Sequence, residues 1–107
     1  SRHFMVFVET SVFTRQVLAL LDDDELAALQ VQLSRAPKSG AVIPGTGGLR
    51  KVRWSCHGRG KRGGVRVIYY HFDQRGQIAM LLIYDKSAAD DMSPEQKRLL
   101  KAIVERW

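Results

Sequence analysis

Two long runs of β-forming residues, VRVIYYHF (65–72) and QIAMLLIY (77–84), constrain the fold of this chain more than any other feature of its sequence. Both runs are apolar at even and at odd positions, so a strand made of either would carry apolar side chains on both faces. Such strands suit the centre of a sheet that is covered on each side. The short turn at 74–76 indicates that the two runs follow each other as neighbouring strands.

The remaining segments predict two further strands and the helices that cover the sheet. HFMVFVE (3–9) predicts a first strand, and LRKVRWSC (49–56) predicts a strand that pairs with the run at 65–72. Helical spacing of apolar residues predicts helices over 10–21, 22–36 and 93–107, whereas 37–48 is a loop by composition. We therefore expect an α+β fold of order β-α-α-β-β-β-α, an antiparallel sheet with two N-terminal helices packed on one face and a C-terminal helix.

The helix boundaries have their own signals. Asp22 and Glu25 are spaced as a capping box, as are Ser93 and Gln96. The capping box and the helix dipole explain the acidic run 22–25 without a metal site. The buried stripe of the second helix is predicted at Leu26, Leu29 and Leu33. In the last helix one face carries Leu99, Leu100, Ile103, Val104 and Trp107, and we expect it to cover part of the sheet or to face a partner.

Length and composition define the class of protein. With 107 residues and no internal break in composition, we expect one domain over 1–107, in which Met5 is the natural start and Ser1–Phe4 a remnant preceding it. A single cysteine, Cys56, excludes an internal disulfide and fits the reducing cytoplasm. No apolar run is long enough to span a membrane, so no membrane partner is expected.

Charge is distributed unevenly along the chain. The net charge is +6, and between Leu26 and Phe72 there is no acidic residue. The stretch from Arg50 to Arg66 carries seven Arg or Lys in seventeen residues. A one-sided basic region of this kind is typical of a protein that binds a polyanion, although a solvated basic surface would have the same composition.

Alternation along the strands predicts which of these charges converge. Lys51 and Arg53 leave their strand on one face, and Arg66 joins them if the hairpin register permits. Arg50 lies on the opposite face. The Gly-rich turn would carry further cations at the rim, and neighbouring tyrosines add base stacking or a hydroxyl. The wider candidate set is Arg50, Arg59, Lys61, Arg62, Tyr69, Tyr70, Tyr84 and Lys86.

Other catalytic sites have no support in the sequence. The histidines and Cys56 lack the spacing of metal ligands, so neither a metal nor another cofactor is expected. No Ser-His-Asp or Cys-His pattern is present, and GTGG lacks the Lys-Ser/Thr of a phosphate loop. An enzyme built on these residues would use cations to offset phosphate charge and would position an internal nucleophile such as an RNA 2′-hydroxyl.

The blocks LRKVRW, GKRGGVRVIYY and LLIYDKSAADDMSPEQ together resemble the RelE/HigB-type toxins of bacterial toxin–antitoxin systems, in the RelE/ParE superfamily. The resemblance covers most of 5–105. It implies a RelE-like fold and a ribosome-dependent mRNA endonuclease that cuts in the A site of the 70S ribosome without a metal. Attack of the 2′-hydroxyl would leave a 2′,3′-cyclic phosphate. It also implies a cognate antitoxin, often a helix-turn-helix protein of HigA type.

The resemblance also assigns candidate roles. It places the catalytic set at Lys51, Arg53, Arg66, Tyr84 and Lys86. The charges and tyrosines of the strands and turn themselves suggest the RNA-binding set Arg50, Arg59, Lys61, Arg62 and Tyr69. The general base is left open between Lys51 and Tyr84 with a lowered pKa. Two other functions also remain open: a ParE-like inhibitor of DNA gyrase and an RNA-binding module without catalysis.

Overall fold

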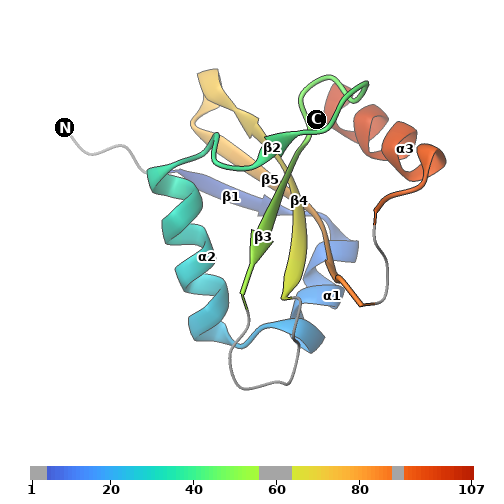
Figure 1. Cartoon of the computed structure of the whole chain (residues 1–107). Helices are drawn as coiled ribbons and strands as arrows, with labels where there is room; N and C mark the ends of the chain where they lie inside the picture. Colours follow the sequence, from blue (N-terminus) through green and yellow to red (C-terminus); the bar gives the residue numbers. More distant parts are fainter. Residues whose placement is uncertain (1–4, 56–63, 88–90) are drawn as a thin grey trace.

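The computed structural model describes residues 5–55, 64–87 and 91–107 of the chain. In this part of the chain the strands form one five-stranded sheet in the order β1-β5-β4-β3-β2 (Figure 1). The two apolar runs are the adjacent inner strands β4 (Val65–Phe72) and β5 (Gln77–Asp85), as predicted. They form an antiparallel meander with β3 (Arg50–Trp54), which confirms the predicted order of the last three long strands.

The edges of the sheet differ from the prediction in two ways. β1 (Val6–Glu9) runs parallel to β5, so the sheet is mixed and not purely antiparallel. Its direction depends on long-range packing, because its partner in the sheet lies about seventy residues later in the chain. The stretch predicted as a loop contains β2 (Ala41–Val42), which pairs with β3. Two exposed residues among glycines and prolines give no periodic pattern from which this strand could be recognised.

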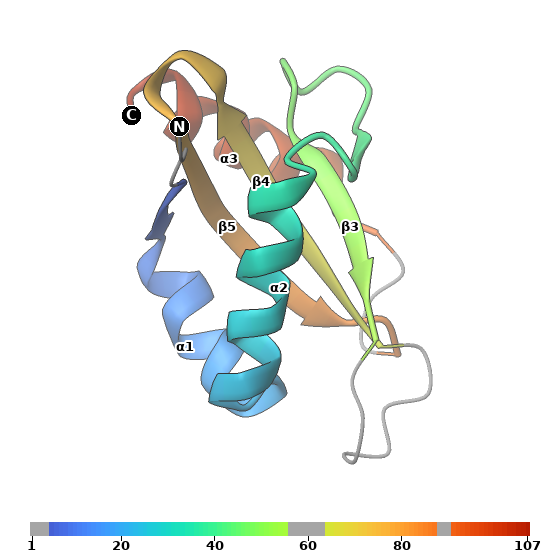
Figure 2. The ribbon, with the colours of Figure 1, turned by 90° about the vertical axis from the view of Figure 1, so that its left-hand side faces the viewer.

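The helices lie on both sides of the sheet. Figure 2 shows α1 (Ser11–Leu20) and α2 (Asp23–Arg35) in front of the sheet and α3 (Pro94–Glu105) behind it. The predicted capping boxes are both present: Asp22 and Glu25 exchange hydrogen bonds at the start of α2, and Ser93 and Gln96 do so at the start of α3. This confirms the predicted helices and their arrangement.

Two hydrophobic cores result. The first lies between the sheet and α1 and α2, and it includes Phe13, Leu29 and Leu33, each fully buried. The second lies between the sheet and α3, where Leu100 packs with Ile68. Strand alternation sends successive side chains of β4 to the two cores in turn. The α3 core covers only part of its face of the sheet, so the remainder is available for a site.

The end of β5 is capped by side chains of α1. β1 pairs with β5 only as far as Met80. Beyond it, the Thr10 hydroxyl donates to the Leu81 carbonyl at 2.8 Å, and the Ile83 amide donates to Oε1 of Gln16 at 3.3 Å. These contacts satisfy backbone groups that the short β1 leaves without a strand partner.

Candidate functional site

The predicted basic residues form a row across three strands. Arg53 on β3 is paired with Arg66 on β4, and Arg66 is paired with Tyr84 on β5. Lys51 lies two residues before Arg53 on β3, opposite Ile68. Paired residues project from the same face of a sheet, so the register brings Lys51, Arg53, Arg66 and Tyr84 together on the side that carries α3. This set is called the basic face below.

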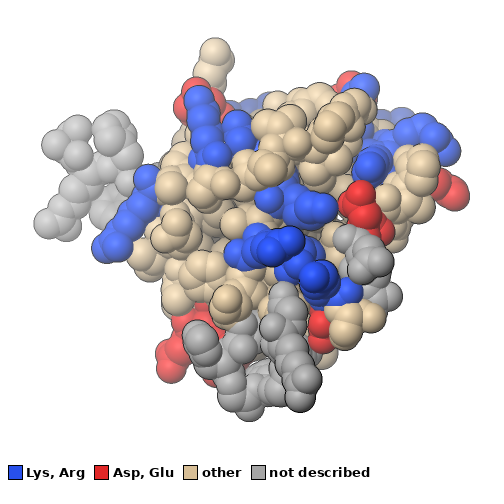
Figure 3. Space-filling view, viewed as in Figure 1, with Lys and Arg blue, Asp and Glu red and all other residues tan. Residues whose placement is uncertain are grey.

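The members of the basic face differ in exposure. Arg53 is exposed, and the Lys51 side chain is 32% exposed. Arg66 is only 4% exposed, and its Nη1 donates a long hydrogen bond of 3.5 Å to the Val65 carbonyl. In Figure 3 the blue Lys and Arg atoms gather at the middle of the molecule, with red acidic atoms beside them on the α3 side. A negative ligand would therefore meet Lys51 and Arg53 first and Arg66 beneath them.

An acidic residue that no sequence pattern signals also belongs to this site. Asp91 lies 3.6 Å from Nζ of Lys51 and 3.8 Å from Nζ of Lys97. The Met92 N–H, which donates to the Asp91 carboxylate at 2.7 Å, holds the pKa of Asp91 below its ordinary value, and Lys51 and Lys97 contribute further. Because Asp91 follows Lys51 by forty residues, no local spacing signals the contact.

Tyr84 has a buried hydroxyl. The atom has no hydrogen-bond partner among the described residues. The Tyr84 residue lines a small cavity of about 90 Å³ together with Asp91 and Met92. Burial, and after it the charge of Asp91, raise the pKa of Tyr84, while Arg66 has a smaller opposing effect. The predicted lowering of the Tyr84 pKa is therefore wrong, and a neutral phenol is a hydrogen-bond donor and not a general base at neutral pH.

Two predicted RNA-binding residues have structural roles. Tyr69 is fully buried on the α1–α2 side, where its hydroxyl accepts from the Gly40 amide at 2.9 Å and donates to the Pro37 carbonyl at 2.8 Å. It is therefore not accessible for base stacking. Arg50 donates to the carbonyls of Lys38 and Gly40 at 3.1 and 2.8 Å, which fixes the segment before β2. Burial contradicts the RNA-binding assignment of Tyr69, whereas the RNA-binding role of Arg50 stays a prediction.

The remaining predicted residues lie at or beyond the rim. Lys86 is exposed just past the end of β5, and its backbone amide donates to the Gly64 carbonyl at 3.4 Å. Tyr70 packs in the α3 core, with its ring centroid 4.7 Å from that of Phe72. Arg59, Lys61 and Arg62, together with Cys56 and His57, lie outside the described residues.

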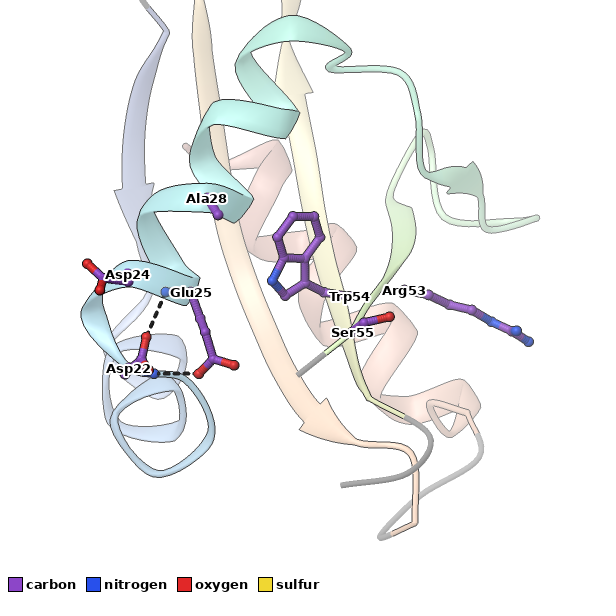
Figure 4. Close-up of a pocket in the computed structure, with 7 residues that line it drawn as sticks. All are labelled: Asp22, Asp24, Glu25, Ala28, Arg53, Trp54 and Ser55. Carbon is purple, nitrogen blue, oxygen red and sulfur yellow. Dashed lines mark hydrogen bonds between the residues drawn. The ribbon is translucent and has the colours of Figure 1, made fainter. Parts of the chain in front are cut away.

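A larger cavity of about 570 Å³ lies between the start of α2 and the end of β3. Figure 4 shows Trp54 pointing toward α2, whereas the Arg53 side chain leaves β3 in the opposite direction. Asp22, Asp24 and Glu25 are the acidic residues of this cavity, and Asp22 and Glu25 form the capping box of α2. The cavity is thus negative on its helix side and does not suit the polyanion expected at the basic face.

In residues 5–55, 64–87 and 91–107, no three His, Cys, Asp or Glu side chains come together as metal ligands. Within the same ranges no helix has the length and apolar character needed to span a membrane.

Comparison with known proteins supports the arrangement of these elements. No protein-family model matches the sequence. Among solved structures the chain is similar to the toxin RelE of E. coli, determined in its free state as a double arginine-to-alanine mutant. The TM-score is 0.60 at 12% sequence identity, and the alignment covers 81% of this chain and 88% of that one.

The chain has the RelE fold. This confirms the RelE-like α+β fold predicted from the sequence blocks. At 12% identity the likeness is one of fold and assigns no role to the side chains of the site. On this RelE fold, the basic face occupies the part of the sheet that α3 leaves uncovered.

Proposed function

We propose that this protein is the toxin of a type II toxin–antitoxin system and acts as a ribosome-dependent mRNA endonuclease. The observation that supports this most strongly is the row Arg53–Arg66–Tyr84, flanked by Lys51, on one face of a RelE fold. Three cations and a neutral phenol converge there, which is the chemistry needed to hold a phosphodiester. A protein-binding surface would have no need for such convergence.

The proposed reaction is attack of an RNA 2′-hydroxyl on the adjacent phosphorus. The P–O2′ bond forms and the P–O5′ bond breaks, leaving a 2′,3′-cyclic phosphate and a 5′-hydroxyl. A water molecule would take the proton of the 2′-hydroxyl, and the leaving O5′ would gain a proton, so no net proton is consumed. Lys51 and Arg53 would hold the phosphate, and Arg66 would stabilise the charge that develops on its oxygens. Tyr84, whose phenol is neutral at neutral pH, would donate a hydrogen bond to the phosphate or to O5′.

Substrate binding would require a local rearrangement. The Tyr84 hydroxyl is buried beside Asp91 and Met92, and Lys51 is ion-paired with Asp91. An RNA phosphate that takes the place of the Asp91 carboxylate would both release Lys51 and open a path to Tyr84. Binding of the RNA phosphate and exposure of the Tyr84 phenol would then be coupled.

The partners follow from this function and are part of the proposal. The substrate would be mRNA in the A site of the 70S ribosome, in the bacterial cytoplasm. A cognate antitoxin of the helix-turn-helix HigA type would neutralise the toxin.

The test is controlled expression in bacteria, with mRNA 5′ ends mapped after induction. We expect new cuts in translated messages, and we expect Arg53→Ala to abolish most of them. Arg35→Ala removes the same charge from an exposed position on α2 and is the matched control. Growth arrest with intact mRNA would overturn the nuclease proposal in favour of a gyrase inhibitor. Salt-sensitive RNA binding without cleavage products would indicate a binding module.

A further inference from the structure

A small polar pocket lies at the start of β3, apart from the basic face. Its volume is about 200 Å³, and its walls come from the segment after α2, the loop that leads into β3, and the end of β4 with the turn that follows. It is called the distal pocket below. The lining residues are Lys38, Gly48, Arg50, Tyr70, His71 and Asp73.

The distal pocket exists because β4 extends beyond β3. The pairing of the two strands begins with Arg50 opposite Tyr69, so the last three residues of β4 have no partner on β3. The loop before β3 approaches this part of β4 at Gly48, where φ is +113° and a Cβ would lie 3.2 Å from Cε2 of Tyr70. A glycine meets both conditions without displacing the Tyr70 ring. The wall of the pocket is thus closely fitted at this point.

Arg50 is held in a fixed orientation beside the distal pocket. Its Nη1 donates to the carbonyls of Lys38 and Gly40 at 3.1 and 2.8 Å. These bonds use Nη1, so Nε and Nη2 of the guanidinium can donate to a ligand. Because two carbonyls already fix the side chain, a ligand would bind to it with little further loss of side-chain freedom.

Lys38 and His71 complete the set of donors. Lys38 is exposed, and its flexible stem lets the ammonium follow a ligand. The His71 side chain is only 9% exposed, and its Nε2 lies 3.9 Å from Oδ1 of Asp73, beyond hydrogen-bond distance. Asp73 is 76% exposed, so water screens its charge. The two cations and the imidazole therefore set the character of the pocket.

A phosphate group of RNA is the ligand that suits these donors best. Guanidinium N–H groups and a lysine ammonium are common partners of phosphate oxygens. A metal cation or a basic peptide would be repelled by Lys38 and Arg50, and an apolar ligand would remove water from their charges without replacing it. In Figure 3, Lys and Arg atoms lie near the turn between β4 and β5 as well as at the middle of the molecule.

The distal pocket and the basic face are two separate places on the molecule. Arg50 lies about 10 Å from Arg53 along β3 at the usual rise of a strand. The two side chains leave β3 on opposite faces of the sheet. An RNA held at both places would be fixed in orientation as well as in position, which is what phosphate contacts outside a reacting centre provide.

We propose that the distal pocket binds a phosphate of RNA at a point separate from the bond that is cut. Lys38, Arg50 and His71 hold this phosphate. Its binding rests on the pocket alone, whereas its role in orienting the RNA for cleavage rests on the proposed function.

Fluorescence anisotropy of the full chain with labelled single-stranded RNA tests the binding. We expect Lys38→Ala to weaken a long strand by about three- to tenfold at low salt and to reduce the salt slope by up to about one. Asp73→Asn, which removes the acid of the pocket lining, should strengthen the same RNA. Arg35→Ala is the matched control, because it removes an exposed cation three residues earlier that does not line the pocket.

The length of the RNA distinguishes the possible sources of the phosphate. Weakening of long strands with unchanged affinity for a trinucleotide would show that the pocket holds the strand that also occupies the basic face. Weakening confined to isolated ribosomal RNA would show that it holds a second RNA. Both results support a phosphate site.

Equal affinities of Lys38→Ala and Arg35→Ala for every RNA tested would overturn the inference, as would an unchanged affinity in Asp73→Asn. RNA cleavage is measured separately on the same proteins. RNA binding that depends on Lys38, in a protein without cleavage activity, would leave the distal pocket as a phosphate site and refute the proposed function.

Discussion

Nζ of Lys51 lies 3.6 Å from the Asp91 carboxylate, although forty residues separate the two in the chain. The contact joins β3 to the segment that leads into α3. It places an internal negative group where the proposed function requires an RNA phosphate. The same carboxylate also raises the pKa of Tyr84, so one residue affects two members of the basic face.

We predict that Asp91→Asn strengthens RNA binding several-fold at low salt and steepens its salt dependence by up to about one unit of slope, because Lys51 becomes available to a phosphate. Stability should change by less than about 1 kcal/mol, since the pair is partly exposed. Fluorescence anisotropy with a labelled RNA gives both quantities. Glu95→Gln removes the same charge from an exposed site on α3. An equal gain in RNA affinity in Glu95→Gln would mean that RNA binding depends only on the net charge of the protein.

Tyr84→Phe should separate stability from activity. It removes a buried hydroxyl that has no partner among the described residues, so the free energy of unfolding should be unchanged or slightly higher. RNA cleavage should fall, by about 10²-fold if the phenol acts as a general acid. Denaturant unfolding and cleavage assays on the same preparation test this. Unchanged cleavage would remove Tyr84 from the site.

The raised pKa of Tyr84 also predicts a pH effect. The folded state holds the phenolic proton more tightly than the unfolded state, whose pKa is near 10. The stabilisation that the protonated Tyr84 phenol gives to the folded state is therefore fully present below about pH 10. It is lost as the pH rises through the higher pKa of the folded state. Unfolding measured from pH 9 upward should show a steeper loss of stability in the wild type than in Tyr84→Phe. Parallel curves would contradict the burial of this hydroxyl.

Arg53→Ala and Arg66→Ala should differ although the two residues are paired. Arg53 is exposed, so its removal should lower RNA affinity and leave stability within about 0.5 kcal/mol. Arg66 is 4% exposed, so its removal should lower both affinity and stability, the latter by about 1–3 kcal/mol. Urea unfolding combined with RNA binding per folded molecule distinguishes the two. Equal stabilities would show that Arg66 is not packed as described.

Tyr69→Phe should lower stability by about 1–3 kcal/mol, because the buried Gly40 amide loses its acceptor and the Pro37 carbonyl loses its donor. RNA affinity per folded molecule should not change. Equilibrium unfolding and anisotropy measure the two effects. A loss of RNA affinity in a stably folded variant would restore the stacking role that burial excludes.

Local chemistry in the sequence was sufficient for the helices, the central strands and the shared face of Lys51 and Arg53, whereas the hairpin register decided that Arg66 joins them. Capping boxes act within four residues, and strand alternation is a fixed geometric consequence of the extended backbone. The same alternation correctly placed Arg50 on the other face, although its hydrogen bonds to Lys38 and Gly40 were not foreseen.

Only the tertiary structure decided the features that depend on distant parts of the chain. The direction of β1 is set by its pairing with β5, and the contact between Asp91 and Lys51 by the path of the chain into α3. The burial of Tyr69 and of the Tyr84 hydroxyl depends on what packs above each strand. Sequence alternation assigns a side chain to a face, but the elements that cover that face determine whether the side chain reaches solvent, and those elements come from elsewhere in the chain.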